Sequence, residues 1–243
     1  MSELYHLTDD IYALPGDITT TRPWIGVVMS AVGTALIDSG NGPRHGHELQ
    51  RALNAAGAAP VTHIFLTHHH WDHHFGSVAF PDATIIAHEW TQRHLTVMAD
   101  EPWSRDYVYA KADRFPRGKV IARQMDRAVG DWSAFRPLPA TITFKDEYTL
   151  PLGDYRIRIW HVGGQHEPDQ ALVQVTPGNV LFLGDAAYGR ASSTDDWDKA
   201  ALAATLRAFA EETGAAWFVE GHRTPSERAP FLARVERLMR SGA

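Results

Sequence analysis

The chain has 243 residues, of which 44% are hydrophobic and 21% are charged, a balance that is typical of globular proteins and excludes disordered, collagen-like and coiled-coil chains. The formal net charge is −6 and no run of Lys and Arg exceeds two residues, so we expect no nucleic acid partner. The 14 histidines and the absence of cysteine exclude disulfides, thiolate metal sites and cysteine nucleophiles.

No targeting or membrane segment is expected. The stretch from Met1 to Tyr12 has no basic region of the kind that opens a signal peptide. The least polar stretch, 25–37, is too short to cross a bilayer and is interrupted by small and polar residues. We therefore expect a cytoplasmic protein without a membrane partner; the oligomeric state is left open.

The predicted elements alternate between strands and helices. The first forty residues predict strands with a hairpin near Gly33, and helix 44–56 follows, with Gly57 as its stop. A buried strand over 62–67 precedes a histidine cluster. Further strands are predicted over 84–87, 141–144, 156–160, 171–175, 180–183 and 216–220, and further helices over 89–99, 101–114, 196–213 and 225–240.

Strand groups lie in both halves of the chain, each followed by helices. This pattern predicts a mixed α/β fold of two packed sheets with helices outside, in a single domain over 1–243, since there is no repeat or low-complexity linker. We interpret residues 100–140 as an inserted lid, irregular over 118–139. It holds aromatic residues that could line an apolar pocket or form a core of the lid itself: Trp103, Tyr107, Tyr109, Phe115, Trp132 and Phe135.

The histidine cluster follows directly on the strand 62–67. Alternate residues at the end of a strand face the same side, so His68 and His70 can converge, while Asp72 and His73 can address a second point. Imidazole and carboxylate are the ligands that Zn²⁺ accepts without thiolate. The alternative is a solvated, histidine-rich loop. The neighbouring His69 and His74 are expected to face away toward solvent, and His45 to lie on an exposed helix start.

Three later residues strengthen the prediction of a metal site. His166, Asp185 and His222 each lie beyond the end of an apolar strand and close to glycine, and ligand sites in layered α/β folds gather at such strand ends. Alone, each is more typical of a structural residue. Together with the histidine cluster they favour a shared metal site.

In this order the seven residues form the pattern His-x-His-x-Asp-His, then His, Asp and His, and the sequence resembles the metallo-β-lactamase superfamily. The resemblance implies a four-layer αββα sandwich with a dinuclear site for two Zn²⁺, or for Mn²⁺, Fe²⁺ or Co²⁺, at one edge. By position, one cation would be bound by His68, His70 and His166 and the other by Asp72, His73 and His222, with Asp185 bridging.

Around this pattern the sequence departs from the family in one place and matches it in another. The segment 161–166 is one residue longer than in many members of the family and lacks their proline. Asp38 matches an early aspartate of the family that supports the ligands, because a metal-bound imidazole needs an acceptor for its other nitrogen. The alternative interpretation is that Asp38 is only a turn residue before Gly40.

Two cations about 3.5–4 Å apart can share a hydroxide that attacks a carbonyl or phosphoryl centre. We therefore expect a zinc-dependent hydrolase that cleaves a lactone, ester or thioester of a small molecule, with Asp72 orienting the hydroxide. Tyr188 stands where some acyl-homoserine lactonases of the family have a tyrosine beside the substrate carbonyl; it would donate to the oxyanion, or is an ordinary half-buried tyrosine. Asp185 in the bridging position disfavours β-lactam hydrolysis.

Three alternatives remain open. The first is a hydrolase of small phosphodiesters. The second is a mononuclear iron enzyme like the persulfide dioxygenases of the family, which would use His68, His166 and Asp185, although the retained residues of the second set argue against it. The third is a metal-binding protein without turnover.

Overall fold

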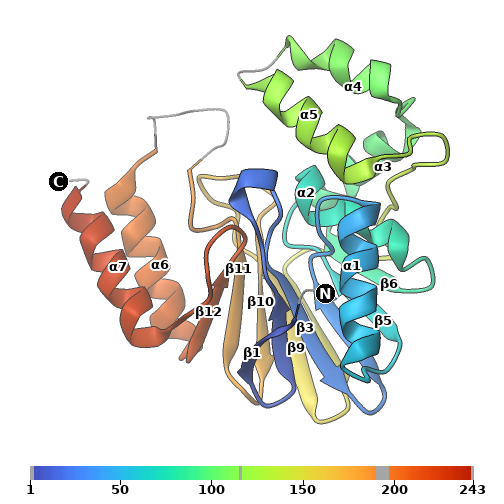
Figure 1. The fold of residues 1–243 in the computed structure, drawn as a ribbon. Helices are drawn as coiled ribbons and strands as arrows, with labels where there is room; N and C mark the ends of the chain where they lie inside the picture. Colours follow the sequence, from blue (N-terminus) through green and yellow to red (C-terminus); the bar gives the residue numbers. More distant parts are fainter. Residues whose placement is uncertain (1–2, 115–116, 190–196, 242–243) are drawn as a thin grey trace.

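The computed structural model describes residues 3–114, 117–189 and 197–241 (Figure 1). The described strands form two sheets, and the first of them has seven strands in chain order. Neighbours are antiparallel from β1 to β4 and parallel from β4 to β7. The strands are β1 (Tyr5–Thr8), β2 (Ile11–Leu14), β3 (Ile25–Ser30), β4 (Gly33–Ile37), β5 (Val61–Phe65), β6 (Thr84–His88) and β7 (Ile142–Phe144).

The second sheet has six strands in the order β13-β12-β11-β10-β9-β8. All neighbours are antiparallel except β11 and β12, which are parallel. The strands are β8 (Glu147–Leu152), β9 (Tyr155–His161), β10 (Ala171–Thr176), β11 (Val180–Gly184), β12 (Trp217–Glu220) and β13 (Ser226–Glu227).

Helices cover the outer face of each sheet, which gives the αββα layers that the resemblance implied and confirms that prediction (Figure 1). Leu49 and Leu53 of α1 and Leu95 of α3 pack on the first sheet, and α6 and α7 pack on the second. The helices are α1 (Pro43–Ala55), α2 (Trp71–His74), α3 (Glu89–Asp100), α4 (Arg105–Ala112), α5 (Gly118–Val129), α6 (Lys199–Thr213) and α7 (Arg228–Ser241).

The apolar runs of β3 and β4 follow from their central place in the sandwich. Val28 and Ile37 point into the core between the sheets, whereas Val27 and Leu36 point into the layer beneath the helices. A strand covered on both faces carries apolar residues at every position rather than at alternate ones. The consecutive apolar residues at 27–29 and 35–37 follow from this position.

Phe182 of β11 shows how closely the two sheets approach. Its side chain is 2% exposed and belongs to the core between the sheets. A Cβ atom at Gly26 of β3 would overlap the Phe182 ring. Glycine at this position therefore leaves the space that the ring fills between the sheets.

The inserted segment is more regular than predicted. The expectation of an irregular chain over 118–139 is wrong in its first half, because residues 118–129 form α5 and bury Ala122 and Val129. The helix predicted over 101–114 begins only at Arg105, after the N-cap Ser104, whose side chain accepts a hydrogen bond from the Tyr107 amide.

The aromatic residues of this segment form a core of its own. Trp103, Trp132 and Phe135 are buried together with Phe75, which follows α2. Phe75 thus anchors the inserted segment to the sandwich through edge contacts with Trp103 and Phe135. Phe115 and the first residue of the helix predicted over 196–213 lie outside the described residues.

The prediction from sequence missed β8. Residues of this edge strand alternate between exposed and partly buried positions, so they form no apolar run. No helix among the described residues has the length and apolar character needed to cross a membrane.

We predict that Phe182→Ala lowers the free energy of unfolding by about 3–5 kcal/mol, because it leaves a cavity between the sheets. Urea unfolding followed by circular dichroism measures this change. The matched control is Val32→Ala, whose side chain is 67% exposed and whose loss should change stability by no more than about 0.5 kcal/mol. A loss below about 1 kcal/mol for Phe182→Ala would contradict the packing described.

Candidate metal centre

The seven predicted ligands lie in loops and a short helix at one edge of the sandwich, where α2 is found (Figure 1). The first of them follow β5 and continue into α2, while Asp185 comes directly after β11 and His222 two residues after β12. His166 lies in the connection between β9 and β10. Because β4, β5 and β6 run parallel, and so do β11 and β12, loops from both sheets meet at this edge.

The first group consists of His68, His70, His166 and Asp185, whose ligand atoms lie within 4.8 Å of one another. His166 Nε2 is 3.0 Å from His70 Nδ1 and 3.3 Å from Asp185 Oδ2. His68 is fully buried beneath them.

The second group consists of Asp72, His73 and His222, again with ligand atoms within 4.8 Å of one another. Asp72 Oδ2 is 3.2 Å from His222 Nε2 and 3.8 Å from His73 Nε2. Asp72 and His73 both come from the short helix α2, and their ligand atoms converge although consecutive residues of a helix point in different directions.

Asp185 stands between the two groups. Its Oδ1 is 3.4 Å from His73 Nε2, and its Oδ2 is 3.5 Å from His222 Nε2 and 3.3 Å from His166 Nε2. The main chain at Gly221 passes so close that a Cβ atom there would overlap Asp185 Oδ1. The glycine before His222 thus lets the last ligand loop close over the carboxylate.

The buried polar atoms of the cluster fit cations. Among the described residues, His68 Nε2, His73 Nε2 and Asp185 Oδ1 are buried without a hydrogen-bond partner. Buried polar atoms are rarely left unpaired, because they have lost their hydration. A donor set of imidazole nitrogens and carboxylate oxygens suits Zn²⁺, and also Mn²⁺, Fe²⁺ and Co²⁺.

Neighbouring groups fix the orientation of these imidazoles. His73 Nδ1 donates to Asp38 Oδ2 at 2.7 Å, and His166 Nδ1 donates to the Gly189 carbonyl at 3.0 Å. His222 differs, because its Nδ1 is buried without a partner in the described part of the chain. Such outer contacts select the nitrogen that is left for a metal, here Nε2 of His73 and His166.

Asp38 is both a turn residue and a residue that supports the histidines, the two interpretations drawn from the sequence. It adopts the left-handed backbone conformation of a turn residue, with φ of 60°. Its carboxylate accepts from His73 Nδ1 and from the Thr67 amide, at 2.8 Å, and the Thr67 hydroxyl, which donates to it, lies 3.1 Å from His68 Nδ1. One aspartate therefore orients a histidine of each group.

Glu167 is a supporting residue that the prediction from sequence missed. Its Oε1 accepts from His70 Nε2 at 3.2 Å, which leaves His70 Nδ1 directed at the first group. The available signal was its position beside His166, since a carboxylate next to a ligand often contacts a second one.

Charges within the cluster favour the ionised form of Asp185, which can bind a metal, but they also favour the protonated form of His222, which cannot. Burial opposes the ionisation of Asp185, but the imidazoles of His73 and His222 outweigh it and hold the pKa of Asp185 well below its usual range. Burial alone disfavours protonation of His222, yet mainly the Asp185 and Asp72 carboxylates raise its pKa to about 9. Binding of a cation at His222 would thus displace a proton.

Tyr188 lies beside the second group. Its hydroxyl accepts a hydrogen bond from the His222 amide at 3.1 Å. Burial and the nearby Asp185 carboxylate raise the pKa of Tyr188 above its usual range, so the phenol stays protonated. Because the oxygen accepts from the amide, the O–H proton is left for a different acceptor.

Two expectations about the other histidines are wrong. His74 is fully buried and meets the edge of the Phe75 ring. His45 is 1% exposed because the first turn of α1 packs under the loop that contains Gly40. His69 Nδ1 contacts Asp169 Oδ1 at 3.0 Å and is only partly exposed.

Comparisons with known proteins identify a family and solved structures of similar fold. The family model described as Metallo-beta-lactamase superfamily matches residues 23–226. A metallo-beta-lactamase from Pontibacter korlensis superposes with a TM-score of 0.65 and 16% identity, covering 98% of this chain and 99% of that one. A metallo beta lactamase from Hirschia baltica gives 0.63 and 14%, covering 98% and 97%. A comparison with curated protein sequences gives no match.

We predict that Asp38→Asn weakens zinc binding by about 10- to 100-fold. An amide that keeps its oxygen toward the Thr67 amide turns its NH₂ group toward the His73 Nδ1–H, so the imidazole loses its acceptor. Competition with a chromophoric chelator measures the affinity. Asp9→Asn is the matched control, because Asp9 is exposed and also has a positive φ, of 44°. Equal affinities of Asp38→Asn and the wild type would contradict this role.

Proposed function

The chain belongs to the metallo-beta-lactamase superfamily, and we propose that it is a metal-dependent hydrolase that cleaves an ester-type bond, in a lactone, ester or thioester, of a small molecule. The observation that carries this proposal is the position of Asp185, within 3.5 Å of histidine nitrogens from both groups. A carboxylate placed in this way can be shared by two cations.

In this proposal His68, His70 and His166 bind one Zn²⁺, Asp72, His73 and His222 bind a second, and Asp185 is shared. When bound, a pair of cations supplies a nucleophile from water at neutral pH and stabilises the negative charge that develops on the carbonyl oxygen. No nucleophilic side chain is then needed, in agreement with a chain that has no cysteine.

Asp72 receives and returns the proton of the reaction. Its carboxylate is buried, and although burial opposes ionisation, chiefly His73 keeps the pKa of Asp72 below its usual range. An ionised carboxylate at this position can accept a hydrogen bond from the attacking water and pass its proton to the leaving group.

Tyr188 contributes a hydrogen-bond donor. With its oxygen accepting from the His222 amide, its O–H can point to the carbonyl oxygen under attack or to the leaving alkoxide. A neutral donor suits this position, because the raised pKa keeps the proton in place at neutral pH.

The β-lactamase activity named for the structural relatives is not transferred to this chain. Their identity of 14–16% supports a common fold only. Asp185, shared between both groups, and the absence of thiolate ligands favour ester-type substrates.

Elemental analysis of the purified protein, followed by matched lactone, ester, thioester and phosphodiester substrates, tests the proposal. About two zinc or manganese ions per chain, with hydrolysis of an ester-type bond that stops on chelation and returns with metal, is expected. If phosphodiesters are cleaved faster than lactones, esters and thioesters, phosphodiesters would replace esters as the proposed substrate class. One iron per chain with oxygen uptake would overturn the proposal.

We predict that Asp72→Ala lowers kcat by at least about 100-fold, because both proton steps lose their carrier. Steady-state hydrolysis of the best ester substrate measures the change. Metal content is determined in parallel, since Asp72 is also a proposed ligand, and Asp72→Asn, which keeps the shape, should share the loss. The exposed Asp82→Ala serves as the control. Wild-type kcat in Asp72→Ala would contradict the assigned role.

We predict that Tyr188→Phe lowers kcat by about 100-fold at unchanged metal content, because an oxyanion donor is lost while the ring stays. Steady-state kinetics and elemental analysis measure both quantities. Tyr5→Phe is the control, since Tyr5 is 38% exposed and lies in β1. If Tyr188→Phe loses metal while its kcat per bound metal is unchanged, the tyrosine only holds the His222 loop.

A further inference from the structure

A polar cavity lies outside the candidate metal centre. It has a volume of about 200 Å³, is partly open to solvent, and lies between the loop around the short 3₁₀ helix η1 (Ile18–Thr20), the start of α1 and the helix α5. None of the proposed metal ligands lines it. Three arginines line it, one from each of these elements: Arg22, Arg44 and Arg127.

Two of these arginines bring positive charge that no described acid neutralises. Arg22 Nη1 forms an ion pair with Glu48 at 2.9 Å. Among the ion pairs of the described residues, none involves Arg44 or Arg127. Arg44 and Arg127 are exposed, so water screens their mutual repulsion, and together they attract an anion to the space between them.

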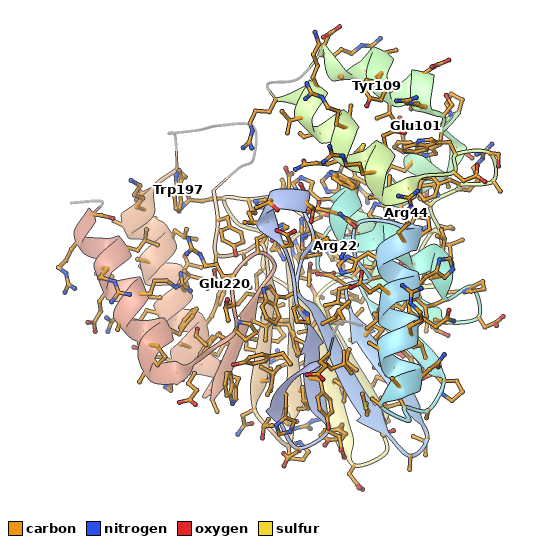
Figure 2. All side chains as sticks on the ribbon, viewed as in Figure 1. Arg22, Arg44, Glu101, Tyr109, Trp197 and Glu220 are labelled. Carbon is orange, nitrogen blue, oxygen red and sulfur yellow. The ribbon has the colours of Figure 1, made fainter. Side chains whose placement is uncertain are left out.

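The position of Arg44 is set by the end of α5. Its guanidinium packs against Gly130, where a Cβ atom would overlap the guanidinium nitrogens. Figure 2 shows Arg44 and Arg22 near the end of α1 that faces α5. An arginine on α1 is thus held against the helix that carries Arg127, which directs both charges to the same space.

Two neutral amide side chains hold the η1 loop in place beside the cavity. Asn41 is 3% exposed, and its Nδ2 donates to the Thr20 carbonyl at 3.0 Å. Gln124 of α5 donates through Nε2 to the Thr19 carbonyl at 3.3 Å. Both side chains line the cavity, so the η1 loop is tied to the start of α1 and to α5, and the shape of the cavity is set in advance.

The start of α1 adds a further attraction for anions. Its N-cap is Gly42, which offers no side chain to the free amides of the first turn. Such amides and the helix dipole favour negative charge. These amides add to the attraction of the arginines for an anion, but the site is defined by the arginines.

One carboxylate, that of Asp17, also lines the cavity. It is engaged by its own loop, accepting from the Thr19 amide at 2.9 Å, the Thr19 hydroxyl at 2.6 Å and the Thr20 hydroxyl at 3.0 Å. The hydrogen bond of the Thr19 hydroxyl first, and then those of the Thr19 amide and the Thr20 hydroxyl, lower the pKa of Asp17, although burial opposes this. With Arg22 paired to Glu48, the charges of Arg44 and Arg127 stand against the one carboxylate of Asp17, so the lining remains positive.

We propose that this cavity binds a small anion through a phosphate or carboxylate group, held mainly by Arg44 and Arg127. Guanidinium groups suit both, because their planar N–H pairs match two oxygens of either group. The bound anion would link the η1 loop, α1 and α5. This site is separate from the metal centre and does not depend on the proposed hydrolase activity.

Isothermal titration of metal-loaded protein with inorganic phosphate and with succinate, at fixed ionic strength, tests the proposal. The wild type should bind at least one of them, and Arg44→Gln with Arg127→Gln should weaken that binding at least 10-fold. Arg123→Gln is the matched control, because Arg123 is exposed on α5 and does not line the cavity. Binding of phosphate alone assigns a phosphate ligand, and binding of succinate alone a carboxylate.

A second variant separates this site from the metals, which also attract phosphate. His222→Ala should keep the binding that depends on the arginines, and bound anion should raise the melting temperature of the wild type but not of the double variant. If the double variant fails to fold, Arg127→Gln alone replaces it. The absence of binding of either anion, or equal binding in the wild type and the arginine variant, would overturn the proposal.

Discussion

The buried carboxylate of Asp185 is the interaction on which the candidate site depends. An ionised carboxylate at 4% exposure costs much free energy unless positive charge lies beside it. His73, His166 and His222 all approach its oxygens within 3.5 Å. Because they come from α2 and from two separate loops, the carboxylate can be accommodated only when segments from both sheets are in place.

The sandwich satisfies this requirement by backbone contacts at the same edge. The Ala171 amide of β10 donates to the Thr67 carbonyl at the end of β5, at 2.7 Å, and thereby joins the two sheets. The Gly221 amide donates to the Gly184 carbonyl at 2.7 Å, directly before Asp185. The ligands thus sit on main-chain segments that are hydrogen-bonded to each other, which is a rigid base for a site that must keep its geometry.

The sequence allowed the clustering of these side chains and the layers to be predicted, because both depend largely on short-range patterns. Alternation after a strand identified His68 and His70, and a strand followed by glycine identified Asp185 and His222. Features that depend on tertiary packing were missed or predicted wrongly. His74 is fully buried although no pattern around it predicted this, and the contact of Glu167 with His70 joins residues 97 positions apart.

The carboxylates around the imidazoles have a consequence for the dependence of metal binding on pH. Asp72 and Asp185 belong to the cluster, while Asp38 and Glu167 contact its histidines. Burial opposes protonation of His222, but the Asp185 and Asp72 carboxylates raise its pKa to about 9. A cation bound at His222 must displace that proton, so its affinity rises with pH up to about 9 and levels off above it.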